Sequence, residues 1–141
     1  MADSGYNWDA TWTSAGTSVD GDTVTDTNSA TSDTISLDGK AACLIGIEIG
    51  VGDTGDPADY CEIEVQGGVN DDIDFEDSAT GTPWSFQIPM AAANRNTSTY
   101  KQFLVDAGSY DDFRVKFTNE CAQDDVTITM TYKTATIPPA S

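Results

Sequence analysis

The chain contains no histidine, and only six of its 141 residues are Lys or Arg. Histidine is the commonest metal ligand and the side chain that most often acts as a general base. Its absence therefore argues against serine triads and the common zinc sites. The 24 acidic residues bring the net charge to −18. Nucleic acids and anionic membranes are bound through patches of Lys and Arg, so we expect neither as a partner.

Long apolar runs and paired cysteines are missing as well. No apolar run approaches the about 18 residues of a membrane span, and the acidic N-terminus lacks the features of a secretory signal, which predicts synthesis in a cytoplasm. Cys43 and Cys61 fall at positions expected to point inward, which predicts buried thiols, with a Cys43–Cys61 disulfide as the alternative. Cys121 is expected in a loop or at an edge. No basic neighbour activates any of the three as a nucleophile.

From residue 34 onwards, apolar and polar residues alternate with a period of two. Such runs are typical of strands with one buried and one solvated face, and turn-forming Gly, Pro, Asn and Asp residues separate them. Seven or eight antiparallel strands predict a single all-β sandwich, either jelly-roll or immunoglobulin-like. The predicted strands are Ala41–Val51, Tyr60–Val65, Trp84–Met90, Phe113–Phe117 and Val126–Lys133, with shorter ones at Thr34–Leu37, Asp72–Phe75 and Tyr100–Val105.

Residues 1–33 differ from the rest because Thr, Ser, Asp, Gly and Asn dominate them. Such a stretch buries too little apolar surface to order itself. We therefore expect an extended polar N-terminal arm at 1–33, the sandwich domain at 34–137 and a short C-terminal tail at 138–141. The aromatic residues of the arm either cap the domain's own core or bind a neighbouring subunit. They are Tyr6, Trp8 and Trp12.

Clusters of acidic residues are the candidate metal sites. Hard oxygen ligands of this kind hold Ca²⁺ in proteins. One group lies on a Gly/Pro-containing loop, at Asp53, Asp56 and Asp59. Solvated surface acids are the alternative interpretation, and we expect no other cofactor. The densest cluster comprises Asp71, Asp72, Asp74, Glu76 and Asp77.

Paired carboxylates can catalyse glycoside hydrolysis without histidine. That chemistry needs a concave sugar site lined by aromatic residues, whereas most aromatic residues of this chain fall at positions expected to point inward. Phosphate-binding loops are not indicated either, because the run Gly50-Val51-Gly52 is followed by Asp and Thr rather than by Lys and a helix. We therefore expect that the protein is not an enzyme.

Three segments carry a resemblance to a known group of proteins. Thr34–Ala41 leads into the first long strand, and Phe113–Asn119 is followed by a turn and then by Val126–Tyr132. With the Ser/Thr-rich N-terminal arm, this pattern resembles the small accessory β-sandwich proteins of tailed viruses (phages), in particular capsid decoration (cement) proteins. The resemblance covers most of the chain, and its motifs are generic for small viral β-proteins.

The resemblance implies a non-enzymatic virion structural protein that binds the outer surface of the capsid and stabilises it through subunit contacts. The implied partners are the major capsid protein or other virion subunits. The protein itself is implied to form a homo-oligomer, with a trimer favoured. The protein would be made in the host cytoplasm and then lie on the outside of the particle. High like charge suits such a location, since it aids solubility and avoids the phosphates of the packaged genome.

Three alternatives stay open. The first is a tail or baseplate accessory protein of the same kind of particle. The second is a carbohydrate-binding β-sandwich, which would need solvent-exposed aromatic residues on one face, with Trp8, Trp12 and Tyr60 as the plausible ones. The third is a Ca²⁺-dependent adhesion module, in which the acidic loops would be metal sites.

Overall fold

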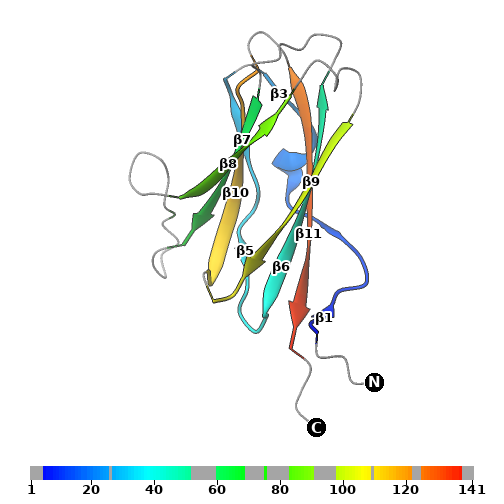
Figure 1. Ribbon diagram of the computed structural model, residues 1–141, viewed down its shortest axis with the longest axis vertical. Helices are drawn as coiled ribbons and strands as arrows, with labels where there is room; N and C mark the ends of the chain where they lie inside the picture. Colours follow the sequence, from blue (N-terminus) through cyan, green and yellow to red (C-terminus); the bar gives the residue numbers. More distant parts are fainter. Residues whose placement is uncertain are drawn as a thin grey trace.

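The computed structural model of the chain is an elongated β-sandwich (Figure 1). It describes residues 5–25, 27–51, 60–68, 75, 83–90, 98–108, 110–121 and 125–137. The short N-terminal elements are β1 (Asn7–Trp8), β2 (Thr13–Ser14), the 3₁₀ helix η1 (Thr17–Val19), β3 (Asp20–Val24), β4 (Ser29–Thr31) and β5 (Ile35–Ser36). The long strands are β6 (Ala42–Val51), β7 (Tyr60–Gly67), β8 (Trp84–Pro89), β9 (Ser98–Asp106), β10 (Asp112–Asn119) and β11 (Val126–Thr136).

The strands form two antiparallel sheets that pack face to face. In the first, here called sheet A, β11 pairs with β6 and β6 with β9, while β1, β2 and β3 follow one another along the other edge of β11. In the second, sheet B, β10 pairs with β7 and β7 with β8, while β4 and β5 pair with the other edge of β10. The chain passes repeatedly between the sheets, and the principal orders β3-β11-β6-β9 and β4-β10-β7-β8 are those of a jelly roll. The predicted sandwich is confirmed. Of the two topologies that the sequence left open, jelly-roll and immunoglobulin-like, the structure has the jelly roll.

The core lies between the sheets because the strands alternate as the sequence predicts. On β10, Phe113, Val115 and Phe117 are fully buried, whereas the residues between them are half-exposed. β6 contributes Ile45 and Ile49 in the same way. The largest fully buried side chains are Phe113, Phe117, Ile45, Ile49, Ile63, Met90, Ile128, Met130, Gln66, Val19, Val65 and Val115.

Most of the predicted strands are present. β6, β7, β8, β10 and β11 match the five long runs, β5 lies within the short run at Thr34–Leu37, and β9 includes Tyr100–Val105. The candidate at Asp72–Phe75 lies largely outside the described residues, and Phe75 itself forms an isolated bridge with Gly68.

The alternation in Trp84–Met90 places Trp84 on the inward face of its strand. The structure agrees, since Trp84 lies opposite the buried Val65 and its ring contacts Phe86 and Phe103, but the side chain is 51% exposed because it begins β8, an edge strand of sheet B.

Cys121 lies just beyond the end of β10 and outside any strand, as expected, but its side chain is fully buried. Cys43 lies in sheet A and Cys61 in sheet B; both are buried as predicted, and the alternative disulfide is not formed.

The N-terminal segment lies along both sheets. β1, β2 and β3 pair with β11, and β4 pairs with β10. Ala15, Val19 and Val24 of this segment are buried in the core. At Gly16 the chain adopts φ 137°, and a Cβ there would come within 3.0 Å of the Asp33 backbone nitrogen, so only glycine fits without strain. The described residues of this segment are thus ordered by backbone pairing of β1 to β4 with β10 and β11, which come much later in the sequence.

Asp9, which follows β1, is hydrogen-bonded to Thr134 of β11. Its Oδ2 atom accepts hydrogen bonds from the Thr134 backbone N–H at 2.9 Å and from the Thr134 hydroxyl at 3.0 Å. The Asp9 backbone N–H donates to the Thr134 carbonyl at 2.9 Å. The backbone hydrogen bond and then the hydroxyl lower the pKa of Asp9 below its ordinary value of 3.8, with smaller effects from Lys40 and Lys133.

Replacing Asp9 with asparagine is expected to lower the melting temperature at neutral pH, because the charge that accepts both bonds is removed. The lowered pKa means that the Asp9 contribution is present above pH 3.8 and is lost as the pH falls through the folded-state pKa. Thermal unfolding followed by circular dichroism should therefore show the two proteins converging in acid. Asp22→Asn, on the exposed part of β3, is the matched control. A difference for Asp9→Asn that persists undiminished at about pH 2 would contradict this assignment.

Candidate binding groove on sheet A

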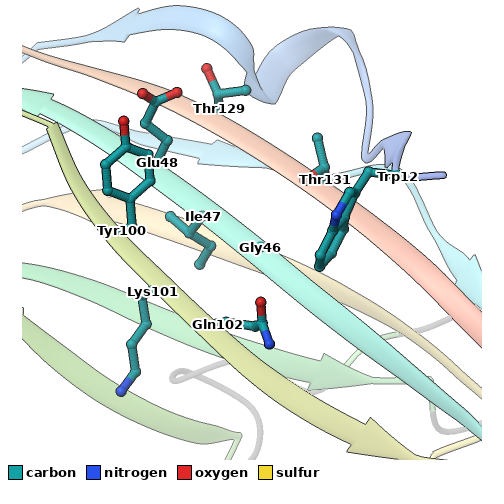
Figure 2. Close-up of a pocket in the computed structure, with 9 residues that line it drawn as sticks. All are labelled: Trp12, Gly46, Ile47, Glu48, Tyr100, Lys101, Gln102, Thr129 and Thr131. Atoms are coloured by element: carbon teal, nitrogen blue, oxygen red, sulfur yellow. The ribbon is translucent and has the colours of Figure 1, made fainter.

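A groove of about 370 Å³ crosses the outer face of sheet A (Figure 2). Its floor is at Gly46, in the middle of β6, where the strand has no side chain. A Cβ at this position would lie 3.2 Å from Thr131 Oγ1 and 3.3 Å from Trp12 Cζ3. The six-membered ring of Trp12 therefore rests on the glycine, and glycine within a strand marks such a close approach. The lining residues are Trp12, Gly46, Ile47, Glu48, Tyr100, Lys101, Gln102, Thr129 and Thr131.

Two aromatic side chains stand on opposite sides of this floor. Trp12, which precedes β2, is 40% exposed and lies beside Thr131 of β11. Tyr100 of β9 is 72% exposed and lies opposite Glu48 of β6 in the strand register. Gln102, opposite Gly46, continues the wall formed by β9. The groove thus combines aromatic walls with amide, hydroxyl and carboxylate groups.

Two lysines lie at the groove, and the ammonium group of each contacts an aromatic ring. The Lys133 ammonium lies over the Trp12 ring, with Nζ 4.8 Å from the ring centroid. Lys101 points away from the groove in Figure 2, and its Nζ lies 5.9 Å from the centroid of the Phe86 ring. Contacts of this kind hold a cation at an aromatic face. Glu48 and Tyr100 lie side by side at one end of the groove (Figure 2).

The structure separates the aromatic residues that the sequence grouped as a partner-binding arm. Trp12 lines the groove of its own chain. Tyr6 and Trp8 pack edge to face with ring centroids 6.0 Å apart, on β1 and just before it. Tyr60, the third candidate for a sugar-binding face, is half-buried at the start of β7. Binding of the arm to another subunit stays a prediction.

The predicted metal-binding acids cannot be placed. Asp71, Asp72, Asp74, Glu76 and Asp77 lie outside the described residues, as do Asp53, Asp56 and Asp59. Within the described ranges, no group of three or more Cys, Asp or Glu side chains is arranged to hold a metal ion. Calcium binding by the acidic loops therefore stays a prediction.

The thiol of Cys43 has no features of a nucleophile. Burial raises its pKa to about 12, and the nearby Asp9 carboxylate adds to the shift. The thiolate is therefore scarce at neutral pH, and reactivity of a cysteine requires the thiolate.

Tyr100 is the aromatic residue of the groove that the sequence analysis missed. It falls in a predicted strand, but its outward orientation depends on the pairing of β9 with β6. Gly46, within the apolar run of β6, was the available signal, since glycine inside a strand often marks close approach of another group. Neither residue by itself indicates a binding site.

The comparisons with known proteins identify the fold. No family model and no curated protein matches the chain. A solved structure described as a family 16 carbohydrate-binding module-2 is 18% identical, with a TM-score of 0.50, and the match covers 79% of this chain and 74% of that one. Dimeric latent PorU from Porphyromonas gingivalis is 10% identical, with a TM-score of 0.50 over 92% of this chain and 13% of its own. At these identities the likeness shows a shared β-sandwich.

A third solved structure, described as CBM4, is 11% identical with a TM-score of 0.40, covering 84% of this chain and 70% of that chain. In the described part of the chain, no helix is long and apolar enough to cross a membrane.

Proposed function

We propose that the protein binds carbohydrate in the groove on sheet A. The observation that carries this proposal is the pair of exposed aromatic side chains, Trp12 and Tyr100, on either side of the Gly46 floor. Pyranose rings present apolar C–H faces and polar edges. An aromatic wall beside amide and hydroxyl groups matches both surfaces, because aromatic side chains supply large contact area and a few placed polar groups set orientation.

The dimensions of the groove suit a sugar chain. Tyr100 lies opposite Glu48, and Trp12 rests on Gly46, two residues further along β6. Two residues of a strand span about 7 Å, and neighbouring strands lie about 5 Å apart, so the space between the walls can hold a pyranose ring. The polar groups that face this space are those of Glu48, Gln102, Thr129 and Thr131. The groove is open at the surface, as binding along a polymer requires.

Binding without hydrolysis fits the residues better than catalysis does. Glycoside hydrolases use a pair of carboxyl groups at a set separation. Glu48 is the only acid among the nine residues that line the groove. The similarity of the fold to a family 16 carbohydrate-binding module supports the same proposal. The virion role implied by the sequence resemblance stays a prediction, and no contact of the described residues favours it over carbohydrate binding.

Titration of the protein with a panel of polysaccharide fragments tests the proposal. The panel contains cello-, xylo-, manno-, laminari- and malto-oligosaccharides, acetylated and deacetylated chitin fragments, and oligouronates. A ligand that stacks on Trp12 is expected to change the tryptophan fluorescence saturably, with a matching heat signal in calorimetry. If no member of the panel binds in either measurement, carbohydrate binding by this groove is wrong.

A further inference from the structure

We infer that the groove prefers glycans that carry free amino groups, through an ion pair between the sugar ammonium and the Glu48 carboxylate. This inference rests on the proposed carbohydrate binding and names the class of sugar. It begins with the place of Glu48. On β6, Glu48 is paired with Tyr100 of β9 on one side and Thr129 of β11 on the other. Its carboxylate points out from the sheet beside these two side chains (Figure 2).

Nothing among the described residues neutralises this carboxylate at the groove. The two lysines near the groove have other contacts: Lys133 lies over Trp12 at 4.8 Å and Lys101 over Phe86 at 5.9 Å. Lys101 also points away from Glu48 in Figure 2. A sugar that stacks on Tyr100 therefore lies beside the Glu48 carboxylate, whereas the Lys133 ammonium lies at Trp12, on the other side of the groove. A ligand ammonium group supplies the opposite charge.

The charge of the whole chain acts in the same direction. With 24 acids against six bases, the surface potential is negative. Such a field concentrates cationic ligands and repels uronic acids and sulfated sugars, although salt screens it over about 8 to 10 Å. Glu48 differs from the general field because it lies within contact distance of a groove-bound ligand, which is shorter than the screening length. Local and overall charge can therefore be distinguished by experiment.

Expected affinities follow from this geometry. At about 4 Å, a charge pair near a protein surface is attractive enough to change affinity about tenfold or more. A glucosamine tetramer should bind about tenfold more tightly than its N-acetylated counterpart, because acetylation keeps the backbone and removes the charge. Oligouronates should bind more weakly than either. The preference should shrink as salt is raised from about 0.05 to 0.5 M.

The test compares three proteins with these two tetramers in isothermal titration calorimetry at about 0.15 M salt. Glu48→Gln should bring the affinities for the two tetramers together, because glutamine keeps the size of the side chain and removes its charge. Glu62→Gln is the matched control, since Glu62 lies on β7 in sheet B and its loss changes the net charge equally. Trp12→Ala should abolish binding of the glucosamine tetramer if it occupies the groove.

Each result decides a different point. Equal losses in Glu48→Gln and Glu62→Gln would mean that the amino sugar responds only to net charge. Full binding by Trp12→Ala would mean that the amino sugar does not occupy the groove. The inference fails in either case. Binding of a neutral fragment with no preference for the amino tetramer would overturn the inference and leave the proposed function intact. If the whole panel fails to bind, both fall together.

Discussion

Replacement of Trp12 by alanine is expected to abolish measurable carbohydrate binding and to leave the sandwich folded. Trp12 forms one wall of the groove and is 40% exposed, so its removal deletes ligand contact without opening the core. Aromatic anchors of this kind contribute about 2 kcal/mol or more to binding, which corresponds to a loss of about 30-fold or more in affinity. Calorimetry with the tightest fragment of the panel measures the loss directly.

Two further variants make this prediction specific. Trp84→Ala removes another half-exposed tryptophan, at the start of β8 in sheet B, and should leave affinity unchanged. Gly46→Val keeps both aromatic walls but adds a side chain where a Cβ would already lie 3.2 Å from Thr131 Oγ1 and 3.3 Å from Trp12 Cζ3. It should displace the Trp12 ring and weaken binding. Loss of binding in Trp84→Ala with retention in Trp12→Ala would place the site elsewhere.

The largest effect on stability is expected from Phe117→Ala. Phe117 is fully buried on β10, between Ile63 of β7 and Ala30 of β4 in the strand register. Truncating a buried phenylalanine costs about 3 to 5 kcal/mol, because apolar contact is lost and a cavity remains. Domains of this size are stable by about 5 to 15 kcal/mol in total, so the variant should lose a large part of its stability.

Urea unfolding followed by circular dichroism measures this change as a shift in the midpoint. Thr118→Ala, the next residue, serves as control because its side chain faces the opposite side of sheet B and bonds only at the surface, to the Ser29 hydroxyl at 3.0 Å. Its cost should be about 1 kcal/mol or less. Similar midpoints for both variants would show that the space between the sheets is not tightly packed at Phe117.

The long strands could be predicted because their alternation is a local property. In β6 and β10, every second side chain is apolar, and the sheet geometry requires no further information to assign the buried face. β3 is different. Its sequence, Asp20–Val24, has no alternating pattern, and it is ordered by pairing with β11, about a hundred residues later. Local composition therefore describes this segment as an arm, although its backbone belongs to a sheet.

The groove could be predicted only in part for the same reason. Trp12 was recognised as a contact residue, but its contact is with Gly46 of its own chain. Tyr100 enters the site because β9 pairs with β6 so that Tyr100 lies beside Glu48. Registers of this kind are set by pairing between distant segments. The sequence analysis named the right class of side chain and could not state which face of which sheet would present it.

The contact of Trp12 with Gly46 and Thr131 has a consequence for co-translational folding. Trp12 is synthesised well before Thr131 of β11, because long strands of both sheets lie between them in the sequence. Topologies dominated by distant pairing fold slowly, and sequences emerge in N-to-C order. Trp12 therefore stays without this contact until β11 has been translated. Nascent chains truncated before β11 should have neither the sandwich nor the groove.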